Sequence, residues 1–356
     1  MTDLLKSYQV LSSDGDLIGT PKFFPSDAVL ISILKTMWTC RLLDERMITL
    51  QRQGTISFAM SALGEEACSV ASSAGLMMED WLYPQYRENG CLFYRGYPIQ
   101  EYVHHMFCNG LDPLLGRQMP NHFGSRKYNV VTCSSPIGTK IPHAVGAAYG
   151  MRLKKEQSIA LVYFGDGAAS EGDFHAGLNF AAVYKTPTLF FCRNNGYAIS
   201  MVCSSQFGGE GIVLRASGYG IKGVRVDGND PIAVYSVVKE ARERALNGEG
   251  PTLIEAMTYR MGGHSTSDDP TRYRNDEEVK QWAEKCPIKR LDAYLTKKGL
   301  WDSSKTEELK SQIQEEITKA IQVAKAAPPP PMHSLIEGVY HDVPKRLEEE
   351  LKEANG

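Results

Sequence analysis

Apolar residues at helical spacing mark the first part of the chain. Between residues 26 and 53 they recur at intervals of three and four, and the pattern ends at Gly54. This predicts one long amphipathic helix, and a second, shorter helix is expected over 64–77. The positions that define the first helix are Leu30, Ile33, Leu34, Met37, Leu42, Leu43 and Met47.

Short apolar runs alternate with helical stretches in the middle of the chain. The runs are SIALVYF (158–164), TLFFCR (188–193), KGVRVD (222–227) and TLIEAMTY (252–259), and helices are expected at 172–185 and 231–247. Strands of this length separated by helices indicate parallel βαβ units, because parallel pairing requires a crossover. The expected fold class is therefore α/β with a parallel sheet.

The end of the chain has a different pattern. Beyond residue 288 it reads as a charged amphipathic helix, which the four prolines at 328–331 must break, and a short tail suited to packing on a partner or on the parent domain follows. A length of 356 residues allows two domains, but we favour one elaborated domain. We expect an N-terminal extension (1–25), an α/β domain (26–287) and a C-terminal helical tail with a proline break (288–356).

Composition and charge exclude several classes of protein. Apolar residues make up 42% of the chain and charged residues 23%, as in ordinary soluble globular proteins. The net charge of −3 offers no footprint for nucleic acid, and no apolar run approaches the ~18 residues of a membrane span. The start, MTDLLKSYQV, resembles neither a secretory signal nor a transit peptide, so we expect a cytosolic chain or one already trimmed for an organelle. The eight cysteines form no C-x-x-C pair, which predicts reduced core thiols.

Asp166 and Asn195 lie 29 residues apart, each at the end of a predicted strand. Ligands of open α/β sheets bind outside the carboxyl ends of the strands, so the two side chains should converge there. Their oxygen atoms suit Mg²⁺. Gly165 and Gly167 allow close approach of the backbone, and the amides that follow can donate to an anion. A diphosphate bridged by Mg²⁺ fits this arrangement, although G-D-G alone also fits a turn with a helix-capping Asp.

The complete span, with G-D-G at 165–167 and N-N at 194–195, resembles the thiamine-diphosphate motif of transketolases, decarboxylases and 2-oxo acid dehydrogenases. Further stretches are similar to the α subunit of the decarboxylating component of 2-oxo acid dehydrogenase complexes, from about residue 8 to residue 345. These stretches are YRENG (86–90), GRQMPNHFGS (116–125), RNNGYAIS (193–200), VRVDGND (224–230), LIEAMTYRMGGHSTSDD (253–269) and TRYR (271–274). GRQMP and HSTSDD resemble the branched-chain enzyme. The implied fold is a parallel-sheet thiamine-diphosphate-binding fold with flanking N- and C-terminal helical extensions.

The resemblance also implies roles for individual residues. The metal ligands would be Asp166, Asn195 and the carbonyl of Tyr197. The cofactor-binding residues would be Tyr86, Arg87, Ser135, Ile137, Gly167, Ala168, Arg193 and His264. Arg87, Arg193 and the hydroxyl of Tyr86 would face the diphosphate, because a guanidinium can bind two oxygens at once. A surface salt bridge is the alternative for Arg87, and plain core packing is the alternative for Ile137.

His264 is the candidate catalytic residue. It follows a predicted strand in a loop rich in glycine and hydroxyl groups, where an exposed imidazole can move protons. In the family, this position contacts the diphosphate and assists reductive acylation of the lipoyl group. The other histidines are interpreted as structural or solvated.

The implied reaction is the oxidative decarboxylation of branched-chain 2-oxo acids, as in a 3-methyl-2-oxobutanoate dehydrogenase, with acyl transfer to a lipoyl-bearing acyltransferase component. Activation of thiamine diphosphate requires a glutamate against its aminopyrimidine ring, which single-chain relatives carry in a second α/β domain. This chain has room for one such domain, so a β subunit in an α2β2 heterotetramer must supply the glutamate. The compartment would be the mitochondrial matrix in a eukaryote and the cytoplasm otherwise.

Several positions depart from the family pattern. Lys140 follows Thr139 where the branched-chain family commonly has Gln in a potassium site, which argues against bound K⁺. Gly263 replaces a second His, and Asn275 stands where animal relatives have a second phosphorylated Ser. Ser265 resembles the regulatory serine of mitochondrial relatives and is a candidate site of inhibitory phosphorylation, with an unmodified turn serine as the alternative.

Two other functions are compatible with the sequence. One is the α subunit of a pyruvate or acetoin dehydrogenase. The other is a non-catalytic scaffold or regulatory subunit that binds no cofactor. The residues that argue against a scaffold are Asp166, Asn195, Arg87 and His264, because such a protein has no reason to keep oxygen ligands and charges around an anion pocket.

Overall fold

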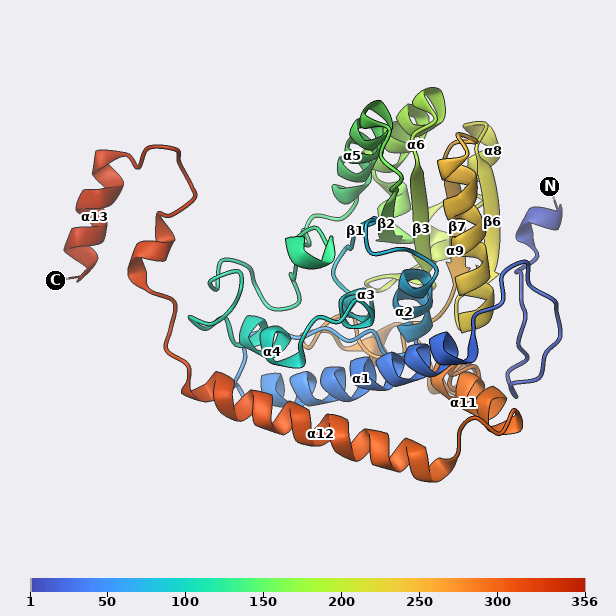
Figure 1. Ribbon diagram of the computed structural model, residues 1–356, viewed down its shortest axis with the longest axis horizontal. Coiled ribbons are helices and arrows are strands. Elements are labelled where there is room, and N and C mark those ends of the chain that lie inside the picture. The colour runs from blue at the N-terminus through green and yellow to red at the C-terminus, as the bar shows by residue number, and fades with distance from the viewer. Residues whose placement is uncertain (1, 356) are drawn as a thin grey trace.

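The computed structural model describes residues 2–355 and has a central sheet of five parallel strands with helices on both faces (Figure 1). In spatial order the strands are β1 (Trp81–Tyr83), β2 (Ala160–Gly165), β3 (Thr188–Asn194), β7 (Thr252–Met257) and β6 (Lys222–Asp227). The four strands predicted from the apolar runs are present and parallel. The α/β class is thereby confirmed. The sequence did not predict β1, because its three residues are too few to show an apolar run or an alternating pattern.

Alternation of side chains along the strands divides the interior into two cores. Leu161 and Phe191 pack into one core, whereas Val162 and Phe190 pack into the other. The first core includes residues of α1 (Asp27–Arg52), α2 (Glu66–Ala74), α9 (Pro231–Leu246), α11 (Pro287–Lys297) and α12 (Ser303–Ala326), and the second includes residues of α5 (Lys140–Lys154) and α6 (Gly172–Tyr184). Both faces of the sheet are covered, so the strands β2, β3 and β7 are buried along almost their whole length.

The segment before α1 is attached to the edge strand of the sheet. The Tyr8 amide donates to the Arg225 carbonyl over 2.8 Å, and the Asp227 amide donates to the Tyr8 carbonyl over 3.0 Å. Asp230 caps α9 through one carboxylate oxygen, and its other oxygen accepts from the amides of Val10 and Leu11, both over 2.6 Å. One buried carboxylate therefore fixes both the helix and the N-terminal segment.

The C-terminal part differs in detail from its predicted single helical tract. It contains α11 and α12 before the prolines, because the chain turns between Lys298 and Asp302. After the prolines an arm passes the 108–118 loop, where the Arg117 guanidinium donates to the carbonyls of Ser334 and Glu337. The last helix, α13 (Lys345–Asn355), lies away from the body of the molecule (Figure 1).

Shorter elements complete the described chain. They are α3 (Asn89–Tyr94), α4 (Ile99–Phe107), α7 (Cys203–Gln206), α8 (Arg215–Gly218), α10 (Asp276–Ala283), the hairpin strands β4 (Tyr197–Ala198) and β5 (Met201–Val202), and the 3-10 helices η1 (Thr2–Leu5), η2 (Arg126–Tyr128), η3 (Gly167–Ser170), η4 (Pro270–Arg272) and η5 (Met332–Leu335). The cysteines are free thiols, as predicted, and only Cys108 and Cys203 are partly exposed. Within residues 2–355, no helix has the length and apolar character needed to span a bilayer.

Candidate functional site

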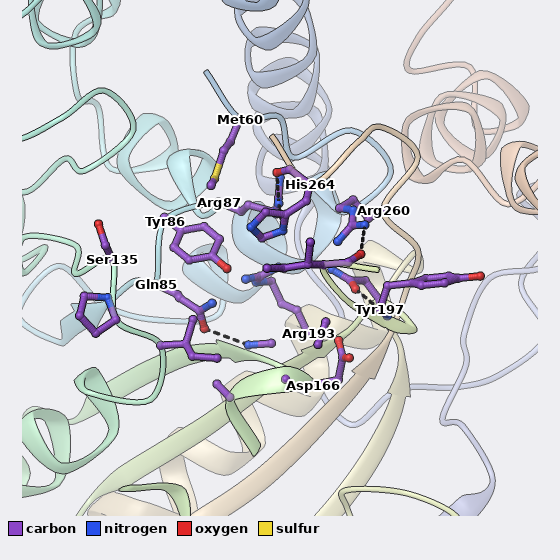
Figure 2. A pocket seen from close by; sticks show the side chains of 18 of the residues that line it. Met60, Gln85, Tyr86, Arg87, Ser135, Asp166, Arg193, Tyr197, Arg260 and His264 are labelled. Carbon is purple, nitrogen blue, oxygen red and sulfur yellow. Dashed lines mark hydrogen bonds between the residues drawn. The ribbon is translucent and has the colours of Figure 1, made fainter. Parts of the chain in front are cut away.

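A cavity of about 570 Å³ opens at the carboxyl ends of β2 and β3 (Figure 2). Every residue predicted to bind the cofactor or the metal lines this cavity, and they come from segments that are far apart in the sequence. The predicted residues are Tyr86, Arg87, Ser135, Ile137, Asp166, Gly167, Ala168, Arg193, Asn195, Tyr197 and His264. Lining residues that the sequence did not indicate as ligands include Phe58, Met60, Gln85, Met119, His122 and Arg260.

Asp166 follows the last residue of β2 and is 1% exposed. One of its carboxylate oxygens, Oδ2, accepts hydrogen bonds from Gln206 Nε2 over 2.8 Å and from the Cys203 thiol over 3.3 Å. Burial raises the pKa of Asp166, and these hydrogen bonds only partly oppose that shift. A cation beside the carboxylate would compensate for its lost hydration.

Asn195 follows β3, and its side-chain amide is held from two sides. Nδ2 donates to Glu65 Oε1 over 3.1 Å, and Oδ1 accepts from the Tyr197 amide over 3.2 Å. Among residues 2–355 no group of three or more His, Cys, Asp or Glu side chains is placed to hold a metal. The possible metal ligands here are one carboxylate, one amide oxygen and a carbonyl, a set that suits a hard cation such as Mg²⁺.

Gly167 allows the G-D-G turn to pack against the β4–β5 hairpin. A Cβ atom at this position would lie 2.7 Å from the Cβ of Ala198, closer than carbon atoms can approach. On the other side, the Gly165 amide donates to Gln85 Oε1 over 3.1 Å. Glycine is therefore required at 167 by close packing rather than by an unusual backbone angle.

Arg193 reaches the cavity but is already paired with two buried carboxylates. Its Nη1 lies 2.6 Å from Glu65 Oε2, and its Nε contacts Glu88 Oε1. Although burial alone would lower the pKa of Arg193, these two carboxylates raise it. Two of the three guanidinium nitrogens are thus engaged within the protein, a pairing that no sequence pattern indicates.

Arg87 contacts His264 across the cavity wall. Its Nη2 donates to the His264 carbonyl and lies 3.2 Å from His264 Nδ1, while its Nη1 donates to the Ser61 carbonyl over 2.6 Å. Burial and the nearby cations Arg87 and Arg260 lower the pKa of His264 to about 4. The imidazole is therefore neutral near pH 7. The Tyr86 ring meets it edge to face at 6.1 Å.

Arg260 lines the cavity, although the sequence did not indicate it as a ligand. Its Nη2 donates to the Ile199 carbonyl over 2.6 Å and to the Tyr273 hydroxyl over 2.8 Å. Within residues 2–355, its buried Nε has no hydrogen-bond partner. A buried guanidinium N–H without an acceptor is costly, and an anionic ligand in the cavity would satisfy it.

Ser135 and His122 form a hydrogen-bonded pair on the opposite wall, although sequence reasoning gave His122 no functional role. Ser135 Oγ lies 2.6 Å from His122 Nε2, and His122 Nδ1 lies 3.1 Å from the Pro120 carbonyl oxygen. Since a carbonyl can only accept, Nδ1 carries the proton and the Ser135 hydroxyl donates to Nε2. Burial lowers the pKa of His122, in agreement with a neutral ring.

Two positions with predicted regulatory or ionic roles lie beside the cavity rather than in its lining. Ser265 pairs with the Ser267 hydroxyl over 2.9 Å. Lys140 begins α5, and burial lowers the pKa of its ammonium group. The preceding Thr139 hydroxyl donates to Ser134 Oγ over 3.1 Å and to a backbone carbonyl over 3.0 Å.

Comparison with known proteins gives consistent results. The family model described as dehydrogenase E1 component matches residues 34–333. The chain is 45% identical over 345 residues to the mitochondrial 2-oxoisovalerate dehydrogenase subunit alpha 2 of Arabidopsis thaliana, covering 96% of this chain and 73% of the relative. It is also 45% identical to the mitochondrial 2-oxoisovalerate dehydrogenase subunits alpha of Caenorhabditis elegans, over 99% of this chain and 82% of the relative, and of Homo sapiens, over 96% and 77%. The resemblance seen in the sequence is confirmed.

Proposed function

The chain belongs to the dehydrogenase E1 component family, and we propose that it is the α subunit of a thiamine-diphosphate-dependent dehydrogenase acting on branched-chain 2-oxo acids such as 3-methyl-2-oxobutanoate. The supporting observation is the single cavity that gathers Asp166, Asn195, Arg87 and His264 at the ends of two parallel strands. Relatives that are 45% identical over 96–99% of this chain bear the name 2-oxoisovalerate dehydrogenase.

Mg²⁺ would be held by Asp166, the amide oxygen of Asn195 and the carbonyl of Tyr197. These residues fit such an ion because the Asp166 carboxylate is desolvated and, among residues 2–355, has no cationic partner within hydrogen-bond reach. The Asn195 nitrogen is also turned toward Glu65, which leaves its oxygen for the cation. The remaining ligands would be diphosphate oxygens and water, as is usual for this ion.

Arg87, Arg260 and the Tyr86 hydroxyl are the donors best placed for a diphosphate. Arg260 fits because its Nε is buried without an acceptor among the described residues. Arg193 also adds positive charge to the cavity wall, but Glu65 and Glu88 neutralise most of that charge. We therefore assign Arg193 a smaller share in diphosphate binding than its position in the motif implied.

Thiamine diphosphate supplies the nucleophilic carbon that allows a 2-oxo acid to lose carbon dioxide. The chain contributes orientation and proton control. His264 Nδ1 faces the Arg87 guanidinium, a donor, so the ring carries its proton on Nε2. A neutral imidazole with a fixed Nε2–H can donate a hydrogen bond beside the reacting groups during acyl transfer to a lipoyl group.

A partner must complete the site. The glutamate that activates the aminopyrimidine ring would come from a β subunit, and we propose an α2β2 heterotetramer that delivers acyl groups to a lipoyl-bearing acyltransferase. The C-terminal arm supports a partner, because it carries apolar side chains that are 43–65% exposed in the single chain. They are Met332, Leu335, Val339 and Tyr340.

Location and regulation follow the relatives. The plant, nematode and human relatives are named mitochondrial proteins, so we propose the mitochondrial matrix if the host is a eukaryote and the cytoplasm otherwise. We also propose inhibitory phosphorylation at Ser265 in a host with a matching kinase. Ser265 directly follows His264, so a phosphate on Ser265 would disturb the His264 side chain.

Reconstitution tests the proposal. The chain co-expressed with its β subunit should retain thiamine diphosphate in the presence of Mg²⁺ and decarboxylate 3-methyl-2-oxobutanoate faster than pyruvate. Faster turnover of pyruvate would assign the chain to the pyruvate or acetoin enzymes. An assembled complex that binds no cofactor would identify a scaffold.

A further inference from the structure

Glu65 is a buried carboxylate directed at the candidate metal site. It occupies the N-cap position of α2, yet its side chain makes no capping hydrogen bond to that helix, and the residue is only 2% exposed. The preceding Gly64 has a φ of +93°, and a Cβ there would lie 2.5 Å from the Tyr259 carbonyl oxygen. The chain is therefore turned tightly against the segment that follows β7, which places Glu65 behind the end of β3.

Both oxygens of Glu65 bind residues that line the cavity. Oε1 accepts from Asn195 Nδ2 over 3.1 Å, and Oε2 accepts from Arg193 Nη1 over 2.6 Å. These partners lie 130 and 128 residues further along the chain. Such long-range contacts form only when the N-terminal end of α2 lies beside the carboxyl end of β3.

The contact with Asn195 determines which end of the amide faces the cavity. An ionised carboxylate only accepts hydrogen bonds, so the amide nitrogen must face Glu65 and the amide oxygen must face away. That oxygen accepts from the Tyr197 amide, which agrees with this orientation and leaves it a second lone pair. Rotation of the amide by half a turn would instead present N–H groups, which cannot bind a metal cation.

We propose that Glu65 is a positioning residue for the metal site, which locks the Asn195 side chain with its oxygen toward the cation. This inference rests on the proposed function, since it concerns the same Mg²⁺. Glu65 is not among the residues that line the cavity, so it acts through Asn195, which is. It also holds Arg193 at the rear of the cavity, so one carboxylate couples a metal ligand to a cationic wall residue.

The test measures how cofactor binding depends on Mg²⁺. The chain assembled with its β subunit is dialysed against a fixed concentration of thiamine diphosphate while Mg²⁺ is increased, and bound cofactor is determined. In Glu65→Gln, the side-chain amide can donate as well as accept, so Asn195 is free to rotate. We expect the half-saturating Mg²⁺ concentration to rise ~10- to 100-fold, the usual effect of removing a residue that orients a metal ligand.

Two variants separate positioning from charge. Glu65→Asp keeps the negative charge near Arg193 but withdraws the carboxylate by one methylene, so it should also raise the Mg²⁺ requirement. Glu66→Gln is the matched control, because Glu66 is adjacent and fully buried but pairs with Arg41 over 2.5 Å, outside the cavity. It should lower the melting temperature and leave the Mg²⁺ requirement unchanged.

A reciprocal exchange provides an internal check. In Asn195→Asp, two carboxylates face each other at hydrogen-bond distance, so cofactor binding should weaken. When Glu65→Gln is added, the glutamine amide donates to the aspartate carboxylate, so the hydrogen bond is restored in the reverse direction. The double variant should therefore bind Mg²⁺ more tightly than Asn195→Asp alone. If the losses of Mg²⁺ affinity in the two single variants simply add up in the double variant, the proposal is overturned.

The outcomes distinguish this inference from the proposed function. If the wild-type complex binds no thiamine diphosphate in a Mg²⁺-dependent way, the proposed function fails and the inference with it. If the wild type binds but Glu65→Gln and Glu65→Asp change only the melting temperature, as Glu66→Gln is expected to do, Glu65 is a structural residue and the inference alone fails.

Discussion

The Arg87 guanidinium touches both the carbonyl and the imidazole of His264, a residue 177 positions further along the chain. Arg87 thus fixes the backbone at the start of a loop and, after burial, adds to the lowering of the pKa that keeps the His264 imidazole neutral. The loop is secured further along by Asp268, whose Oδ2 accepts from the His264 amide over 2.6 Å and from the Tyr273 hydroxyl over 2.5 Å. These contacts make the charge state of His264 a measurable property of the site.

The first prediction concerns the titration of His264. Its pKa of about 4 lies below the unfolded value of 6.5, so the unfolded chain binds more protons between these pH values. The contribution of His264 to stability is therefore complete above pH 6.5 and is lost as pH falls toward 4. Imidazole NMR should give a midpoint near 4 in the wild type and a higher one in Arg87→Gln. A wild-type midpoint near 6.5 would contradict the assignment. Arg272→Gln, which removes an exposed cation, is the control.

The second prediction concerns the metal ligand at the end of β2. Asp166→Ala should leave the fold intact, because the lost carboxylate faces the cavity, but weaken Mg²⁺-dependent binding of thiamine diphosphate by more than ~100-fold, beyond the usual cost of losing an orienting residue. Asp173→Ala removes an exposed carboxylate from the first turn of α6 and should have no effect. Unchanged cofactor affinity in Asp166→Ala would refute the metal site.

The third prediction concerns the isolated chain. Without a β subunit it should show no decarboxylation, because the acid that activates the aminopyrimidine ring lies on another polypeptide. The measurement is carbon dioxide release from 3-methyl-2-oxobutanoate with thiamine diphosphate and Mg²⁺. Activity should appear when purified β subunit is added. Steady turnover by the α chain alone would show that the site is complete without a partner.

The fourth prediction concerns Lys140. We expect its ammonium group to occupy the potassium position of the family, where Ser134, Thr139 and the Pro136 carbonyl offer oxygens. A second cation there would be repelled, so activity should barely change when K⁺ is replaced by Na⁺. Lys140→Gln removes the ammonium group and should introduce a K⁺ requirement. A strong K⁺ requirement in the wild type would show that Lys140 points elsewhere.

The fifth prediction concerns Ser265. A phosphate adds about −1.5 to −2 charges, and here it would compete with Asp268 for Arg260 and so loosen the loop that holds His264. Ser265→Glu should lower the activity of the whole complex by ~10- to 100-fold, since small displacements of a catalytic group cost this much. Ser265→Ala should retain activity, which separates the effect of charge from loss of the hydroxyl. Normal lipoyl acylation in Ser265→Glu would refute the proposal.

The sequence by itself determined the features that depend on neighbouring residues. Apolar runs predicted β2, β3, β6 and β7, because strands of a parallel sheet covered by helices bury apolar side chains, and the run is weakest in the edge strand β6. Turn glycines and polar residues directly after these strands placed Asp166 and Asn195 at one edge of a sheet. Resemblance to a family added Arg87 and His264, which no local pattern connects.

Only the tertiary structure decided how the charges of the site are shared. The resemblance implied that Arg193 faces the diphosphate, and the fold also pairs it with Glu65 and Glu88 from distant segments. Arg260 and His122 line the cavity although the sequence assigned neither of them a binding role. Buried ion pairs and hydrogen bonds form between residues that folding brings together, and their strength depends on the water that packing excludes. A linear pattern records neither the distance nor the exclusion, so these relationships appear only once the chain has folded.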